Sequence, residues 1–223
     1  MPLPVRIGRL RPPVLCFVAG PETTKDLEAT VAAAVAGGVT MVQLRDRAMP
    51  AGDLLDLTRR LKTICRGKAL LVVNDRVDIA VAAEADGAQL PENGIPTLVA
   101  RGLVGKHAVL GRSVHSVEGA IQAGRESAEF VIAGTIYKSA SKPDVKPVGT
   151  GLISEIHQAG NVPVLAIGGI TAKNIGDVVK AGAAGVAVIS AIAAASDPRA
   201  AAEELSKALI DAWTEARATP LSA

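Results

Sequence analysis

Short, uninterrupted apolar runs recur along the whole chain and are separated by stretches with helical patterning. Eight such runs, each of four to six residues, are rich in Val, Ile, Leu and Ala and do not alternate apolar with polar positions. Strands of that kind are buried on both faces, as in a parallel sheet covered by helices. The predicted strands are 14–19, 39–44, 69–73, 87–90, 108–111, 130–133, 162–167 and 185–189.

A helical stretch follows each predicted strand, and Thr24 is the expected N-cap of the first one. Eight strand–helix units of roughly 25 residues each predict an α/β fold, a single-domain (β/α)8 TIM barrel. A doubly wound open sheet is the alternative, because alternation alone does not show that a sheet closes. One helix ends at Gly182, and the others are predicted at 23–36, 51–66, 77–85, 97–102, 117–126, 150–159 and 198–218.

The absence of any linker-like stretch favours one domain over residues 1–223, with 1–13 as a lead-in and 219–223 as a C-terminal tail. Hydrophobic residues make up 49% of the chain but aromatic residues only 2%, so the core is aliphatic. The net charge of +2 comes without a Lys/Arg block, so neither nucleic acid nor a membrane is an expected partner. A small-molecule ligand is expected, and the sequence leaves room for a homo-oligomer.

Cys16 and Cys65 lie in apolar surroundings with no CxxC spacing, which predicts buried free thiols in a reducing compartment. The N-terminal stretch carries prolines where a signal sequence needs an unbroken apolar core, and no run is long enough to span a membrane. The expected location is therefore the cytoplasm.

Polar residues gather directly after the predicted strands. The carboxyl ends of barrel strands meet at one rim, which holds the active site in this architecture. Six such clusters converging on one rim are hard to explain by solvation alone. They are Gln43 with Arg45, Asn74 with Asp75, residues 112–115, the polar loop 134–149, Gly168 with Gly169, and Ser190.

The residue types suggest roles in binding. Gly168, Gly169 and Ser190 leave backbone N–H groups free, which favours an anion site such as one for phosphate, although glycine pairs also simply make tight turns. Arg45 can bind a carboxylate or phosphate with two N–H groups. Asp75 could hold a divalent cation, or could pair with Arg45 or Arg76.

The remaining candidates serve hydrogen bonding and proton transfer. Gln43 and Asn74 can donate and accept along the edge of a ring. Hydroxyl and ammonium groups in the 134–149 loop resemble an anion-binding set, with an ordinary solvated loop as the alternative: Ser139, Ser141 and Lys142. His115 is the one histidine at the predicted rim, where it could act as an acid or base, or could simply pack.

In this order, six segments resemble those of the superfamily of thiamine phosphate synthase and thiazole tautomerase (TenI): VQLRDR, VVNDRVDIA, GRSVHS, SASK, VPVLAIGGIT and GVAVISAI. The resemblance covers about Val14 to Ala201. It implies a (β/α)8 barrel that binds a thiazole phosphate, with the phosphate at the loops of Gly168, Gly169, Ile189 and Ser190.

The two branches of the superfamily imply different chemistry. The synthase joins a pyrimidine diphosphate to the thiazole phosphate and needs Mg²⁺ on two carboxylates. The resemblance assigns the first to Asp75, whereas Gly94 occupies the position of the second. The tautomerase needs no metal and would use His115 to shift a proton within a carboxythiazole phosphate.

We therefore expect an isomerase of thiamine biosynthesis, a thiazole tautomerase without a metal or other cofactor and with His115 as the acid/base residue. Two alternatives remain. One is the Mg²⁺-dependent synthase, with Asp75 as a metal ligand and either Glu92 or Asn93 replacing the missing carboxylate. The other is a non-catalytic binder of thiazole phosphate that acts as a regulator.

Overall fold

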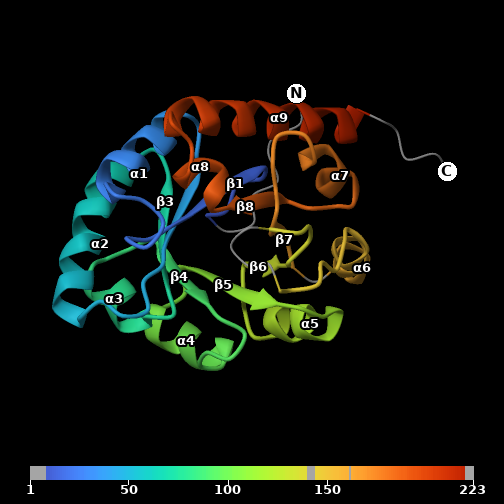
Figure 1. Cartoon of the computed structure of the whole chain (residues 1–223). Helices are drawn as coiled ribbons and strands as arrows, with labels where there is room; N and C mark the ends of the chain where they lie inside the picture. Colours follow the sequence, from blue (N-terminus) through green and yellow to red (C-terminus); the bar gives the residue numbers. More distant parts are fainter. Residues whose placement is uncertain (1–8, 140–143, 161, 219–223) are drawn as a thin grey trace.

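The computed structural model describes residues 9–139, 144–160 and 162–218. Eight parallel strands each pair with the next along the chain, and β8 pairs with β1 to close the barrel (Figure 1). Closure confirms the predicted (β/α)8 barrel and excludes the open sheet. The strands are β1 (Val14–Ala19), β2 (Met41–Leu44), β3 (Leu70–Asn74), β4 (Gly87–Leu90), β5 (Val109–Val114), β6 (Phe130–Ala133), β7 (Val164–Ile167) and β8 (Gly185–Val188).

Helices surround the barrel on its outside (Figure 1). The four-residue α8 directly after β8 was not predicted, and the long α9 packs across α1 and α7. None of the described helices combines the length and apolar character that a membrane span requires. The helices are α1 (Leu27–Ala36), α2 (Ala51–Cys65), α3 (Val77–Ala82), α4 (Thr97–Val104), α5 (Val117–Arg125), α6 (Gly151–Ala159), α7 (Ile175–Lys180), α8 (Ser190–Ala193) and α9 (Pro198–Ala218).

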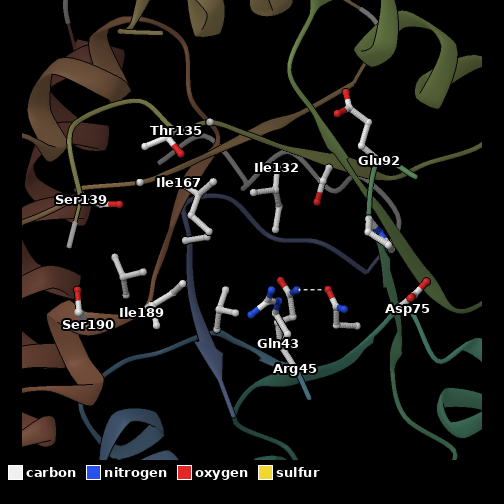
Figure 2. A pocket seen from close by; sticks show the side chains of 18 of the residues that line it. Gln43, Arg45, Asp75, Glu92, Ile132, Thr135, Ser139, Ile167, Ile189 and Ser190 are labelled. Carbon is white, nitrogen blue, oxygen red and sulfur yellow. Dashed lines mark hydrogen bonds between the residues drawn. The ribbon is translucent and has the colours of Figure 1, made fainter. Parts of the chain in front are cut away.

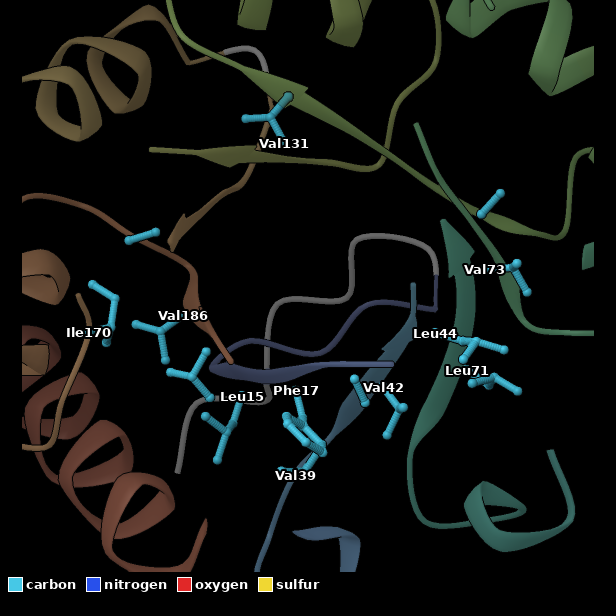
Figure 3. Close-up of a cluster of buried hydrophobic side chains, with 14 of the residues drawn as sticks. Leu15, Phe17, Val39, Val42, Leu44, Leu71, Val73, Val131, Ile170 and Val186 are labelled. Atoms are coloured by element: carbon cyan, nitrogen blue, oxygen red, sulfur yellow. The ribbon is translucent and has the colours of Figure 1, made fainter. Parts of the chain in front are cut away.

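Side chains along the strands alternate between the inside of the barrel and the layer under the helices, and most of them belong to two hydrophobic clusters. On β1, Leu15 and Phe17 face outward into the layer between sheet and helices (Figure 3), whereas Cys16 and Val18 face into the barrel. Both faces of the strands are lined mainly by apolar side chains, which explains why apolar and polar residues do not alternate in the sequence. Cys16 and Cys65 are buried free thiols, as predicted, and burial raises the pKa of Cys16 to about 12.

The start of α1 differs from the expectation. The N-cap is Asp26, not Thr24: the Asp26 carboxylate accepts a hydrogen bond from the Ala29 N–H at 3.0 Å. The Thr24 hydroxyl instead shares a 2.8 Å hydrogen bond with the Thr30 hydroxyl. The helix therefore begins later than predicted, because the Thr24 hydroxyl bonds to another side chain and does not cap the backbone N–H groups of the helix.

A buried carboxylate braces the barrel just before β4. Asp86 is 7% exposed and accepts from Arg9 at 2.7 Å, from Lys62 at 2.7 Å and from the Leu71 N–H at 2.9 Å. Burial alone would disfavour its charge, but the Leu71 N–H and the Lys62 ammonium outweigh burial, so the pKa of Asp86 lies below its ordinary value. This carboxylate joins the lead-in, α2 and β3.

Candidate active site

A cavity of about 760 Å³ opens at the carboxyl ends of the strands. The alternation of strand side chains explains its floor, because every second residue points inward. Inward residues near the strand ends line it: Val18, Gln43, Asn74, Ser113, Ile132, Ile167 and Ala187. Loop residues that follow the strands form the walls (Figure 2).

Gln43 and Asn74 form a buried amide pair at the bottom of the cavity. The Gln43 Nε2 group donates to Asn74 Oδ1 at 2.9 Å, and the two residues are only 4% and 9% exposed. Gln43 Oε1 is buried and has no hydrogen-bond partner in the described part of the chain. A buried acceptor without a partner costs about 1–3 kcal/mol, so it is suited to accept from a ligand N–H or O–H group.

Glycines and hydroxyl groups line one end of the cavity, which we call the anion end after its predicted ligand. Gly168 and Gly169 have φ values of +102° and +65°, which L-residues with side chains rarely adopt. A Cβ added to Gly168 would lie 2.5 Å from Thr135 Cγ2. Ile189 and Ser190, from the turn into α8, line the same end, as does Ser139 (Figure 2).

The opposite end carries carboxylates (Figure 2). Asp75 has no ion-pair or hydrogen-bond partner for its side chain among the described residues. Its two predicted partners are engaged elsewhere: Arg76 binds Asp78 with both Nε and Nη2, and Arg45 binds Glu22 at 3.0 Å. Asp75 therefore forms no close ion pair with either arginine, although its charge contributes to the raised pKa of Arg76 after the larger effect of Asp78.

Glu92 is the second carboxylate at this end of the cavity. Its Oε2 lies 2.7 Å from His115 Nδ1, which links the loop after β4 to the end of β5. Arg112 holds the same loop by donating to the backbone oxygens of Glu92 at 2.7 Å and Ile95 at 2.5 Å. The loop thus keeps its carboxylate at the rim although Gly94 has none.

Asp46, the third acidic residue of the lining, is used structurally. Its Oδ1 atom accepts from the Ala48 and Met49 N–H groups, both at 2.7 Å. Asp75 is thus left without a hydrogen bond or ion pair among the described residues, whereas Glu92 offers a ligand or a cation only what its contact with His115 leaves over. Among the described residues there is no group of three or more His, Cys, Asp or Glu side chains that could hold a metal by themselves.

The structure brings the predicted site residues that it describes to one cavity. Ser141 and Lys142 lie outside the described residues, as do positions 1–8 of the lead-in and the tail 219–223. Thr135 lies within the predicted 134–149 loop but was not singled out. The apolar floor at Ile132 and Ile167 was missed, although strand parity would have indicated it. The predicted residues that line the cavity are Gln43, Arg45, Asn74, Asp75, His115, Ser139, Gly168, Gly169, Ile189 and Ser190.

A closed (β/α)8 barrel with a polar cavity at the carboxyl ends of its strands is the arrangement of a barrel enzyme acting on small molecules. A family model described as thiamine monophosphate synthase matches residues 15–192, and the chain belongs to this family. The protein is accordingly an enzyme.

Individual relatives agree with the family. The chain is 45% identical over 177 residues to a thiamine-phosphate synthase of Roseiflexus castenholzii, covering 78% of each chain. It is 45% identical over 183 residues to a putative thiamine-phosphate synthase of Geobacter sulfurreducens, covering 81% of this chain and 86% of the relative. The solved thiamine phosphate pyrophosphorylase of Pyrococcus furiosus superposes with a TM-score of 0.82 at 34% identity, covering 89% of this chain and 96% of that one.

These relatives overturn the prediction of a thiazole tautomerase. Curated relatives that are 38–45% identical are named as synthases, and the branch assignment of the sequence analysis is therefore wrong. The prediction relied on Gly94, where the synthase pattern has a carboxylate. Glu92, two positions earlier and already named as a replacement, lines the same cavity, so the absence of a carboxylate at position 94 does not by itself exclude a synthase.

Proposed function

We propose that this protein is a thiamine phosphate synthase, a transferase that joins a hydroxymethylpyrimidine diphosphate to a thiazole phosphate and releases diphosphate. The observation that carries the proposal is the two-ended cavity. Glycine loops line one end and two carboxylates the other, with the Gln43–Asn74 pair between them (Figure 2). A transferase that must hold two phosphorylated substrates side by side needs two such ends.

In this reaction the bond between the pyrimidine methylene carbon and the diphosphate oxygen breaks, and diphosphate leaves with the electron pair. The thiazole ring nitrogen then bonds to the methylene carbon. The loops at Gly168, Gly169, Ile189 and Ser190 hold the thiazole phosphate, so that its ring lies over the floor of the cavity. Gln43 Oε1 accepts from the amino group of the pyrimidine and orients that ring.

Arg45 binds the leaving diphosphate, for which it exchanges the carboxylate of Glu22. His115 is held through Nδ1 by Glu92, so its Nε2 atom can hydrogen-bond the same group. Ser139, Ser141 and Lys142 are proposed to bind phosphate oxygens from the loop after β6. None of these residues needs to move a proton between carbon atoms, in contrast to the role expected for His115 in an isomerase.

The donor set fits a magnesium ion that arrives with the diphosphate. Mg²⁺ is usually held by one or two carboxylates together with substrate phosphates, not by a complete protein cage. Asp75, which has no side-chain partner in the described ranges, and Glu92 are the residues that would hold it. When bound, Mg²⁺ neutralises charge on the leaving diphosphate and so favours its departure.

Diphosphate release from the two substrates, measured with and without Mg²⁺, tests the proposal. We expect release that requires both substrates and the metal. Asp75→Asn should lower the rate about 10- to 100-fold, the range for weakening a metal site. Asp78→Asn is the matched control, because Asp78 is exposed, pairs with Arg76 and does not line the cavity.

Tight binding of thiazole phosphate without any diphosphate release would contradict the proposal and favour the non-catalytic binder. If the Asp75 and Asp78 variants lost the same fraction of the diphosphate release rate, Asp75 would not be a metal ligand.

A further inference from the structure

The loop that leaves β7 contains two consecutive glycines, and hydrogen bonds must therefore set its peptide orientations. Gly168 and Gly169 have no side chains that would restrict their φ and ψ angles. The backbone oxygen of Gly168 accepts from the Tyr137 N–H at 2.9 Å. The backbone oxygen of Gly169 accepts from a side chain, the Nδ2 group of Asn174, at 2.9 Å.

These two hydrogen bonds decide where the neighbouring N–H groups point. In a trans peptide the C=O and N–H groups point in opposite directions. The Gly168 oxygen faces the segment after β6, so the Gly169 N–H faces away from it. By the same geometry, the Ile170 N–H points away from Asn174.

Neither of these N–H groups has a hydrogen-bond acceptor within the described ranges, and both residues line the anion end of the cavity. Consecutive N–H groups without protein acceptors can form a concave anion-binding site. Of the two peptides, the one after Gly169 is held less firmly, because its oxygen is bound by a side chain and not by another backbone segment.

Asn174 is free for this task because it does not cap its own helix. It is the N-cap residue of α7, yet its side chain makes no capping hydrogen bond to that helix. Instead, Oδ1 accepts from the Thr171 N–H at 2.9 Å while Nδ2 donates to Gly169. The side chain thus binds the loop at two points, Gly169 and Thr171.

We propose that Asn174 is a positioning residue for the substrate phosphate: by holding the Gly169 oxygen, it keeps the Ile170 N–H directed into the anion end of the cavity. This role rests on the proposed function, which assigns the thiazole phosphate to that end. Without Asn174 the Gly169 peptide is free to rotate, and a flipped peptide turns its carbonyl oxygen toward the phosphate.

The test compares Asn174→Ala and Asn174→Asp with the wild-type protein. Asn174→Asp keeps an acceptor for the Thr171 N–H, loses the donor to Gly169 and adds a negative charge. Titrations at low and high salt separate the effect of the added charge from that of the lost donor, so this variant remains informative if the alanine variant folds poorly. Calorimetric titrations with inorganic phosphate, thiazole phosphate and the unphosphorylated thiazole alcohol measure binding without turnover. Asp26→Ala is the control, because it removes an N-cap hydrogen bond from α1, outside the cavity lining.

We expect both Asn174 variants to raise the Kd for inorganic phosphate and thiazole phosphate roughly 10- to 100-fold, as for one hydrogen bond to a charged group. The Kd for the thiazole alcohol should change by no more than about twofold, since that ligand lacks the phosphate group. In the two-substrate assay, the KM for thiazole phosphate should rise by a similar factor while kcat changes little. Asp26→Ala should alter stability but none of these constants.

An unchanged Kd for inorganic phosphate and thiazole phosphate in both variants would overturn the proposal. An equal loss of affinity for the thiazole alcohol and for thiazole phosphate would also overturn it. The two proposals also fail separately. If the wild-type protein releases no diphosphate, the synthase assignment fails, but the phosphate titrations still decide the role of Asn174.

Discussion

Replacing Gly168 by alanine tests whether the loop after β7 has to keep its observed backbone to bind an anion. The new Cβ would lie 2.5 Å from Thr135 Cγ2, 2.9 Å from Thr135 Cα and 3.1 Å from the Ile136 nitrogen. Carbon atoms pack best at about 3.5–4.0 Å, so the loop must withdraw from the Thr135 methyl group by roughly 1 Å. The φ value of +102° adds strain that the methyl group cannot relieve by moving.

The magnitude follows from these contacts. Holding a residue with a Cβ in such a conformation costs about 1–3 kcal/mol, which lowers the Tm by roughly 2–12 °C for a chain of this size. Displacing a binding group by about 1 Å can cost on the order of 100-fold in activity. We therefore expect Gly168→Ala to fold, to melt earlier, and to bind thiazole phosphate about 10- to 100-fold more weakly.

Gly176→Ala provides a matched control. Gly176 lies in α7, and a Cβ there would meet no atom within 4 Å. Alanine should stabilise the helix by about 0.5–1 kcal/mol and leave ligand binding unchanged. Thermal denaturation without ligand and calorimetric titration with thiazole phosphate measure both effects. If Gly168→Ala bound the ligand like the wild-type protein, the loop would not need this backbone geometry and our reasoning about the anion end would be refuted.

Two further variants test the structure away from the glycine loop. Asp86→Asn should destabilise the fold by about 1.5–3 kcal/mol at neutral pH, because it removes a charge that three donors bind. The pKa of Asp86 is lowered in the folded state, so its contribution is present above the unfolded pKa of about 4 and is lost as the pH falls through the folded value. Urea denaturation from pH 7 to pH 3 should therefore show a smaller acid-dependent loss in the variant, and parallel curves would contradict this role. Glu92→Gln keeps an acceptor for His115 but loses the charge, and should raise the Mg²⁺ concentration for half-maximal diphosphate release about tenfold. An unchanged Mg²⁺ dependence would leave Asp75 as the single carboxylate ligand.

Much of the fold could be predicted from local patterns. Each apolar run became a strand because both of its faces are buried, and the errors were small shifts at the ends of elements and one short helix that was not predicted. The boundary of α1 was missed because Asp26 and Thr24 are both good N-cap residues, and the choice depends on Thr30, which binds the Thr24 hydroxyl. The extra helix α8 has four residues, too few for a periodic signal.

The candidate site was predicted in its positions but not in its contacts. His115, Asp75 and Gly168 follow strand ends, so a barrel brings them to one rim whatever their neighbours are. The contact between Glu92 and His115 joins residues 23 positions apart and depends on the loop that Arg112 holds. Glu92 and Asn93 were both named as replacements for the carboxylate missing at position 94, but the sequence could not decide between them, and the choice of the tautomerase gave the missing carboxylate more weight than its replacement.

By itself the sequence determined the number of strands, the burial of both sheet faces and the edge at which polar residues gather, because these depend on residue type and spacing along the chain. Only the tertiary structure decided that β8 closes on β1, that Gln43 pairs with Asn74, and that Glu92 reaches the cavity from a neighbouring position. These features depend on distances between segments far apart in the chain, and side chains set such distances only after the barrel has brought the segments together.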